Sequence, residues 1–255
     1  MLKVKNLYKS FADRIVINGV SFSLEDGDIV GLVGPSGVGK SVLLKLLAKV
    51  IEPDDGEVVR MSGPVGRRME TYSVGFLFQE SALFDSMTTL DNVSFPLLSS
   101  ADNKNKISVP EAQDRAYKIL TEVGLARAYD KLPGELSGGM RRRAGIARAL
   151  VNHPELVLLD DPTGGLDPVA ASVIMDLIAK LHAMYNPTII LVSHDIRRLL
   201  PRVNRVFGLF NGKIACDCAP GKLVDDAPEA VVKFLATRYD FGKQDSHDLQ
   251  MMEQD

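Results

Sequence analysis

The sequence predicts an α/β fold in which a parallel sheet carries an N-terminal antiparallel β layer and an inserted helical subdomain. Short apolar runs at 156–159 and 188–192 are typical of strands buried on both faces of a parallel sheet. An amphipathic helical pattern separates them, from Val169 to about Met184, and alternating strands and helices indicate parallel pairing. Residues 2–24 alternate between apolar and polar side chains, which indicates the antiparallel layer.

The segment from about 79 to 151 is expected to be the helical insertion. Apolar residues recur at helical spacing between Pro110 and Gly124, and a second helix is expected to begin at Ser137. Before the first of these helices, the polar and unperiodic segment 99–108 is expected to be a loop.

The composition is that of an ordinary globular protein, with 255 residues, 45% hydrophobic and 25% charged. We expect residues 1–239 to form one domain and the polar residues 240–255 to form a disordered tail. The net charge of −3 gives no electrostatic reason to expect nucleic acid as a partner, and the run Arg141–Arg143 is typical of a solvated helix face. No run approaches ~18 consecutive apolar residues, so contact with a membrane is expected to require a partner.

The segment GLVGPSGVGKS at 31–41 contains the spacing G-x-x-x-x-G-K-S of a phosphate-binding loop. It lies between an expected strand at 28–33 and an expected helix from Val42 to Val50, which is the context that this motif requires. Loop amides and the helix N-terminus attract phosphate, a lysine reaches the β- and γ-phosphates, and a serine hydroxyl ligates Mg²⁺. A nucleoside triphosphate site is therefore predicted at Gly34, Pro35, Ser36, Gly37, Val38, Gly39, Lys40 and Ser41.

Two adjacent aspartates follow the apolar run at 156–159. Asp160 ends the expected strand, where it can hold the Mg²⁺ shell beside the phosphates. Asp161 points elsewhere, and a carboxylate facing the γ-phosphate can orient or activate water. The two side chains are therefore expected to have different roles.

A second glycine-rich helix start occurs in ELSGGMRRRAGIARAL at 135–150, where Ser137 is placed as an N-cap. Free amides and the helix dipole make such a start an anion site, although this motif by itself is also typical of a plain cap. Together with the phosphate loop and DDPTGGLDP at 160–168, the sequence resembles the ATP-binding-cassette (ABC) ATPase family over about residues 2–235.

The resemblance implies ATP and Mg²⁺ as cofactors and gives roles to further residues. Phe11 matches the aromatic residue that stacks on adenine, with a place in the core of the β layer as the alternative. Gln79 matches the glutamine that contacts Mg²⁺ and water and links to the transmembrane partner, and Asp167 the acid that spans the dimer interface. His194 matches the switch histidine near the γ-phosphate. The implied catalytic residues are Gln79, Asp161 and His194, the implied Mg²⁺ ligands are Ser41, Gln79 and Asp160, and the implied signature motif is Ser137, Gly138 and Gly139.

The resemblance also implies a homodimer, because the signature motif binds the γ-phosphate of ATP held by the opposite subunit. Two identical chains related by a twofold axis would form two composite sites with ATP between them. The sequence departs from the family pattern at Met140, where the family has glutamine, and at Asp161, which stands in place of the usual catalytic glutamate.

Within the family, the sequence is most similar to the ATPase subunits of Mla/Mce-type phospholipid transporters. The similarity lies in LFQESALFDSMTTLDNVSFPL at 77–97, the Met-ended signature and GKLVDDAPEAVVKFL at 221–235. It implies transmembrane permease subunits and an Mce-type lipid-binding protein as partners, with the chain on the cytoplasmic face of the inner (plasma) membrane. An apolar groove for a membrane-subunit helix is expected at Leu83, Phe84 and Met87, with packing inside the insertion as the alternative.

Two other functions remain open from the sequence. One is the ATPase of an importer of amino acids or another small solute, since such importers also carry apolar residues after the glutamine. The other is a soluble ABC ATPase of DNA repair, translation or cofactor assembly. A coiled-coil insertion or two fused cassettes would favour this last function, and neither pattern occurs in the sequence.

Overall fold

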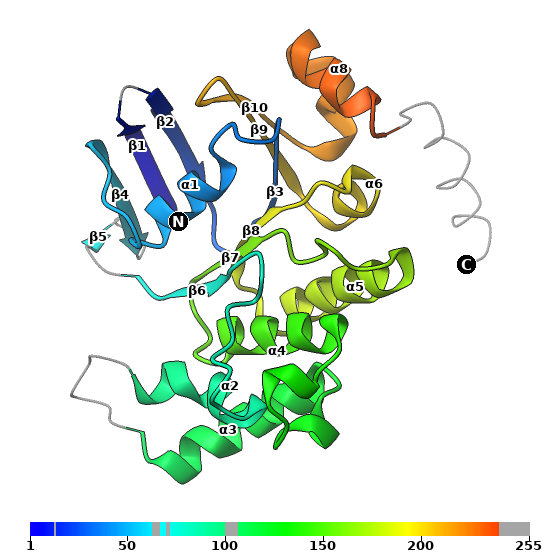
Figure 1. The fold of residues 1–255 in the computed structure, drawn as a ribbon. Coiled ribbons are helices and arrows are strands. Elements are labelled where there is room, and N and C mark those ends of the chain that lie inside the picture. Colours follow the sequence, from blue (N-terminus) through cyan, green and yellow to red (C-terminus); the bar gives the residue numbers. More distant parts are fainter. Residues whose placement is uncertain (13, 63–66, 70–71, 100–106, 240–255) are drawn as a thin grey trace.

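A six-stranded sheet runs through the centre of the protein, and the other elements cover it (Figure 1). The computed structural model describes residues 1–12, 14–62, 67–69, 72–99 and 107–239. Five of the strands are parallel, and β10 pairs antiparallel with β9 at one edge. In spatial order the strands are β10 (Lys213–Cys218), β9 (Arg205–Phe210), β3 (Ile29–Val33), β8 (Thr188–Val192), β7 (Leu156–Asp160) and β6 (Val74–Leu77).

The central strands are buried on both faces, as their apolar runs predict. In β7, Leu158 belongs to the same buried cluster as the apolar residues of α1 (Lys40–Leu47), whereas its neighbour Leu159 belongs to the cluster of α5 (Pro168–Tyr185). Successive side chains of a strand point to opposite faces, so one short run supplies both clusters. The predicted parallel core is confirmed.

A separate four-stranded antiparallel sheet packs beside this core (Figure 1). Its most buried side chains include Leu7, Ile17 and Leu24, which alternate with more exposed residues along their strands. The predicted N-terminal β layer is thereby confirmed. Its strands, in spatial order, are β2 (Arg14–Leu24), β1 (Leu2–Phe11), β4 (Asp55–Ser62) and β5 (Arg67–Met69).

Helices between β6 and β7 form the insertion, which lies on the far side of the central sheet from the β layer (Figure 1). Each begins after an N-cap hydroxyl that accepts a backbone N–H three residues on, as helix starts require. Residues 79–88 contain no helix, and residues 100–106 of the expected loop and the expected tail at 240–255 lie outside the described residues. The helices are α2 (Thr89–Leu98), α3 (Val109–Glu122) and α4 (Gly138–Leu150), with N-caps Thr88, Ser108 and Ser137. The C-terminal part adds α6 (Ile196–Leu199), α7 (Leu223–Asp226) and α8 (Glu229–Ala236).

The helix after the phosphate loop is shorter than the sequence pattern predicts. We expected it to reach Val50, whereas α1 ends at Leu47. Lys49 adopts a left-handed φ of 56°, and the Val50 N–H bonds back to the Lys45 carbonyl at 2.9 Å. The chain turns here, so Val50 is 54% exposed and the prediction is wrong for the last three positions.

Among the described residues, α5 alone is long and apolar enough to cross a membrane, judged by length and composition. All but one of its buried residues belong to the cluster on the helical face of the central sheet, Ala171 being the exception. This is the packing of a core helix in an α/β fold. The buried residues are Ala171, Ile174, Met175, Ile178 and Leu181.

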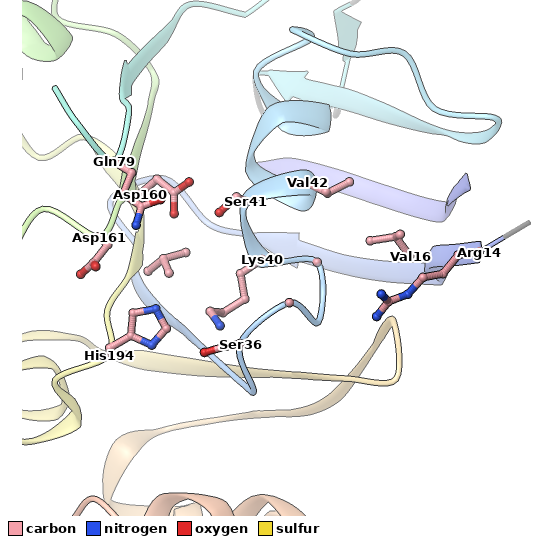
Figure 2. Close-up of a pocket in the computed structure, with 13 residues that line it drawn as sticks. Arg14, Val16, Ser36, Lys40, Ser41, Val42, Gln79, Asp160, Asp161 and His194 are labelled. Atoms are coloured by element: carbon pink, nitrogen blue, oxygen red, sulfur yellow. The ribbon is translucent and has the colours of Figure 1, made fainter. Parts of the chain in front are cut away.

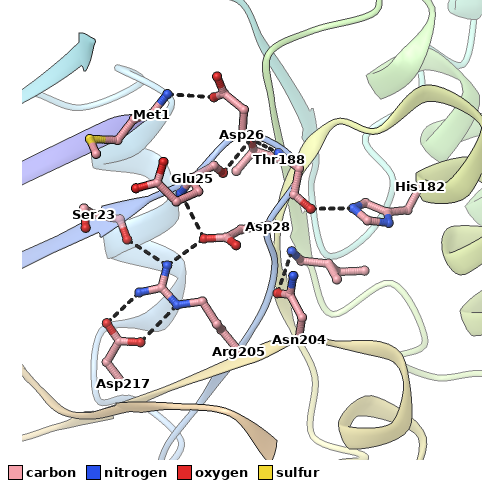
Figure 3. Close-up of polar contacts among 12 residues, drawn as sticks. Met1, Ser23, Glu25, Asp26, Asp28, His182, Thr188, Asn204, Arg205 and Asp217 are labelled. Atoms are coloured by element: carbon pink, nitrogen blue, oxygen red, sulfur yellow. Dashed lines mark hydrogen bonds and ion pairs between the residues drawn. The ribbon is translucent and has the colours of Figure 1, made fainter. Parts of the chain in front are cut away.

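Arg205, the first residue of β9, joins three segments at the amino-terminal end of the central strands (Figure 3). Its guanidinium donates to the Ser23 carbonyl at 3.0 Å and to the Asp28 carboxylate at 2.6 Å. It also donates to both carboxylate oxygens of Asp217, at 3.1 and 2.7 Å. This network ties the β layer to the edge of the central sheet, at the end opposite to the phosphate loop.

Replacing Arg205 with alanine is expected to lower the free energy of unfolding by about 2–3 kcal/mol, because it leaves the mostly buried Asp28 carboxylate without its charged partner. Arg202→Ala is the matched control, since Arg202 pairs with an Asp176 side chain that is 64% exposed and such pairs contribute about 0–1 kcal/mol. Denaturant unfolding measures both. Equal stability of the two variants would contradict the role given to the Arg205 network.

Candidate nucleotide-binding and hydrolysis site

Residues from several distant segments of the sequence come together at the carboxyl ends of the parallel strands (Figure 2). Gln79 follows β6, Asp160 ends β7 and His194 follows β8. With the phosphate-binding loop they line a cavity of about 350 Å³. Open α/β sheets bind their ligands at this edge.

The phosphate-binding loop depends on glycine where it passes other backbone. Gly34 has a φ of 152°, and a β-carbon there would lie 2.2 Å from the Leu209 carbonyl oxygen. Gly39 has a left-handed φ of 112°, and a β-carbon there would lie 2.8 Å from Val16 Cγ1. The loop therefore packs tightly on β9 and β2 while leading directly into the N-terminus of α1, where amides attract phosphate.

The Lys40 side chain lies inside this loop. Its ammonium donates to the carbonyls of Gly34 at 2.8 Å and Pro35 at 2.9 Å, and the residue is 6% exposed. Burial lowers the pKa of Lys40, while the charges of Asp160 and Asp161 act in the opposite direction. A positive charge is therefore held where the loop would surround the phosphates. Of the other predicted loop residues, Ser36, Gly37, Gly39 and Ser41 line the cavity, and Val38 packs against the core.

The residues predicted to hold Mg²⁺ meet in this cavity. Figure 2 shows the Asp160 carboxylate facing the Ser41 hydroxyl, with Gln79 beside them. A hydroxyl, an amide oxygen and one carboxylate are hard oxygen donors, and Mg²⁺ takes one or two carboxylates while the substrate phosphates supply further ligands. The donor set fits Mg²⁺.

Asp161 is oriented differently from its neighbour. Its carboxylate points away from Ser41 in Figure 2, and the residue is 8% exposed with a left-handed φ of 49°. Burial raises the pKa of Asp161; the charges of His194, Arg142 and Lys40 lower it, and that of Asp160 raises it further. The two aspartates thus face different surroundings, which supports the separate roles expected for them.

A second cavity, of about 550 Å³, continues on the other side of Asp161 and His194. Residues 163–166 and Pro168 form one wall, and Arg238, beyond the end of α8, reaches the cavity from the C-terminal part. Arg238 was missed by sequence reasoning, since nothing in the local pattern shows where a C-terminal segment packs.

The signature residues lie in a third cavity, of about 480 Å³. Ser137, Gly138 and Gly139 line it together with Asp167, and the lining includes none of the phosphate-loop residues. The Asp167 carboxylate also caps α5, accepting the N–H groups of Val169 at 2.9 Å and Ala170 at 3.0 Å. On one chain, the predicted residues therefore form two groups. One lies around the phosphate loop, and the other joins the signature residues to Asp167.

The residue predicted to contact adenine is exposed at the end of a strand. Phe11 ends β1 with 49% of its surface exposed, and the Lys9 ammonium lies 5.6 Å from its ring centre. It is absent from the lining of the loop cavity, so its role stays a prediction. Arg14 and Val16 line the cavity instead, and Figure 2 shows both on β2. Only the packing of β2 behind the loop reveals them.

Three curated relatives cover most of this chain. It is 36% identical over 235 residues to Protein TRIGALACTOSYLDIACYLGLYCEROL 3, chloroplastic, of Arabidopsis thaliana (84% of this chain, 67% of that protein). It is 35% identical over 243 residues to the Intermembrane phospholipid transport system ATP-binding protein MlaF of Haemophilus influenzae (92% and 90%). It is 36% identical over 237 residues to the Phosphonates import ATP-binding protein PhnC of Wolinella succinogenes (89% and 86%).

A solved structure and a family model agree with these relatives. The dimeric structure of a post-hydrolysis state of the ATP-binding cassette MJ0796, bound to ADP and Pi, superposes with a TM-score of 0.74 at 30% identity. It covers 86% of this chain and 99% of that chain. The family model described as ABC transporter matches residues 17–164, more than half of the sequence. The chain therefore belongs to the ABC transporter family, as an ATPase that binds and hydrolyses ATP to power transport.

Proposed function

We propose that this chain is the ATPase subunit of an Mla/Mce-type phospholipid transporter. The observation that carries the proposal is the likeness to MlaF, which extends over 92% of this chain and 90% of that protein. A second relative, from Arabidopsis thaliana, bears the name of a glycolipid. The likeness thus includes segments outside the ATP site.

At the ATP site, we propose that Ser41, Gln79 and Asp160 hold Mg²⁺, which would neutralise charge on the β- and γ-phosphates. Lys40 would hold the same phosphates from the loop side. Asp161 would orient the attacking water, with His194 facing the γ-phosphate. The support is the meeting of these six side chains in one cavity at the sheet edge.

We propose a head-to-tail homodimer as the active form. The signature cavity contains helix amides and the Ser137 hydroxyl, which suit phosphate, yet its lining shares no residue with the phosphate-loop cavity of the same chain. A second copy related by a twofold axis would supply the missing phosphate. The dimeric state of the solved relative supports this arrangement.

An exposed apolar patch formed by Phe84, Phe95 and Leu98 is the proposed docking site for a helix of the transmembrane permease. The ring centres of Phe84 and Phe95 lie 4.9 Å apart in an edge-on contact. Phe84 and Leu98 are each 43% exposed, and Phe95 is 37% exposed. Leu83, by contrast, packs against the core, which favours the packing alternative for that residue. Docking there would keep the chain on the cytoplasmic face of the inner membrane.

Replacing Phe84 with aspartate is expected to release the chain from its membrane partner, because a charge would be placed in the apolar contact. ATP binding by the isolated chain is expected to survive, since Phe84 lies outside the ATP cavities. Co-purification of the tagged chain with membrane proteins measures docking, and nucleotide titration measures binding.

The control for this prediction is Tyr117→Asp. Tyr117 is also 43% exposed and also contacts a second aromatic ring, Tyr129, but it lies on α3. This variant is expected to stay with the membrane partner. Release by both substitutions, or loss of folding by Phe84→Asp, would contradict a specific docking patch.

The substrate class is tested by purifying the chain from membranes with its partners and identifying bound molecules by mass spectrometry. Phospholipid enriched over the bulk membrane, and an Mce-type protein in the complex, are the expected results. The second candidate is a small-solute importer, favoured by the 36% identity to PhnC and the 34% identity to a sulfate/thiosulfate importer subunit, CysA of Pseudomonas syringae. A periplasmic-type solute-binding partner with no lipid would favour that candidate.

A further inference from the structure

Arg142 is a buried arginine that connects the signature helix to the backbone of Gln79, which lines the ATP cavity, and to that of Gly164. It lies on α4, five residues after Ser137, and it is 9% exposed. One nitrogen of its guanidinium donates to the Gln79 carbonyl and, at 3.5 Å, to the Phe78 carbonyl. The other donates to the Gly164 carbonyl at 2.9 Å. One planar group therefore joins three segments that are far apart in the sequence.

Gly164 in turn touches the Asp161 carboxylate. A β-carbon at Gly164 would lie 2.4 Å from Asp161 Oδ2, so the carboxylate rests directly on the glycine backbone. The Gly164 N–H also donates to the Asp161 carbonyl at 3.1 Å. Asp161 holds a left-handed φ that is costly for a non-glycine residue, and such a conformation persists only where the surroundings fix it. The position of Gly164 therefore determines where the Asp161 carboxylate lies.

We propose that Arg142 is a positioning residue for ATP hydrolysis, which holds Gln79 and the Asp161 carboxylate at a fixed separation from the signature helix. The inference rests on the proposed role of Asp161. Arg142 acts through the backbone carbonyls that it binds, chiefly those of Gln79 and Gly164. Its position on α4 links the helix that begins at the signature to the group that works on the water.

The geometry calls for arginine in particular. A guanidinium presents several N–H donors in a rigid fork, so it can bind the carbonyls of Gln79 and Gly164 together. A lysine ammonium is a point donor on a flexible stem, and it would keep the positive charge while releasing one of the two segments. The charge and the bridge can therefore be separated by Arg142→Lys.

The test measures kcat and KM for ATP in Arg142→Lys and in Asp161→Asn, singly and combined, using the full chain. Displacing a water-orienting group by a fraction of an ångström is expected to lower kcat about 10–100-fold. KM for ATP is expected to change less than about twofold, because the phosphate loop is untouched. In the Asp161→Asn background, Arg142→Lys is expected to lower the residual rate by a clearly smaller factor, since the carboxylate is gone and only the effect through Gln79 is left.

Two further variants provide an independent test and a control. Gly164→Ala displaces the Asp161 carboxylate without altering α4, and it is expected to reproduce the loss of kcat even if Arg142→Lys is unstable. Arg115→Gln removes an exposed arginine that pairs with Glu111 on α3, and it is expected to leave kcat unchanged. A wild-type kcat in folded Arg142→Lys would overturn the inference, and so would equal fold-losses in both backgrounds or a parallel rise in KM. A wild-type rate in Asp161→Asn would instead overturn the role of Asp161, and the inference with it.

Discussion

Replacing Lys40 with alanine is expected to abolish ATP turnover, with a loss of at least about 10²–10³-fold in kcat, as for other groups that stabilise transition-state charge. The Lys40 ammonium is the cation inside the phosphate loop, 2.8 and 2.9 Å from two of the loop carbonyls. When a triphosphate enters, no other loop side chain carries a charge to replace it. Steady-state ATP hydrolysis by the purified chain measures the effect.

The control for this change is Lys45→Ala, which removes the same charge from the last turn of α1. Its ATP turnover is expected to match that of the wild type. Circular dichroism of both variants is expected to show the native fold. A Lys40→Ala protein that turns over ATP at the wild-type rate would remove Lys40 from the mechanism.

Mixing Lys40→Ala with Ser137→Arg extends the test to the dimer. Each variant alone is expected to be inactive, because every composite site then lacks one of its halves. A heterodimer has one site with both halves intact, so random mixing is expected to restore about a quarter of the wild-type activity. A mixture no more active than its components would contradict the shared sites.

Sequence patterns predicted the central sheet well because its strands are short, apolar and buried on both faces. The run at 156–159 had no other simple placement once helical patterns flanked it. The end of α1 could not be predicted in the same way. Val50 continues the apolar pattern, and only the left-handed turn at Lys49 shows that the chain has already left the helix. Local periodicity carries no information on such a turn.

The candidate site was predictable where a residue type and its spacing suffice. The loop residues follow from the motif spacing, Asp160 and Asp161 from their place at a strand end, and His194 from the family resemblance. Both aspartates and His194 meet Lys40 and Ser41 of the loop in one cavity. Arg14 and Arg142 could not be found in this way. Arg14 enters the site because β2 passes behind the loop, and Arg142 belongs to an arginine run whose neighbours are more exposed. Only the tertiary packing shows which of the three arginines is buried.

Replacing Asp161 with asparagine is expected to leave ATP binding intact and to slow hydrolysis by about 10²–10⁴-fold, the range for lost general-base or water-orienting groups. Asp160→Asn is the matched comparison, because it removes a charge one residue away. That variant is expected to weaken Mg²⁺-dependent nucleotide binding itself, since Asp160 faces Ser41 (Figure 2). Nucleotide titration with and without Mg²⁺, together with single-turnover hydrolysis, separates the two effects. Equal behaviour of the two variants would contradict their separate roles.

Asp161→Glu then tests how closely the pocket fits the shorter carboxylate. Glutamate keeps the charge, so this variant is expected to hydrolyse ATP at least about tenfold faster than Asp161→Asn. It is also expected to remain slower than the wild type, because the Asp161 carboxylate already rests on Gly164 and an added methylene must move it from that contact. A glutamate variant faster than the wild type would mean that reach toward the water, rather than fit against Gly164, limits the rate. The carboxylate on Gly164 would then lie short of its catalytic position, and closure of the dimer around ATP would have to bring the water to it.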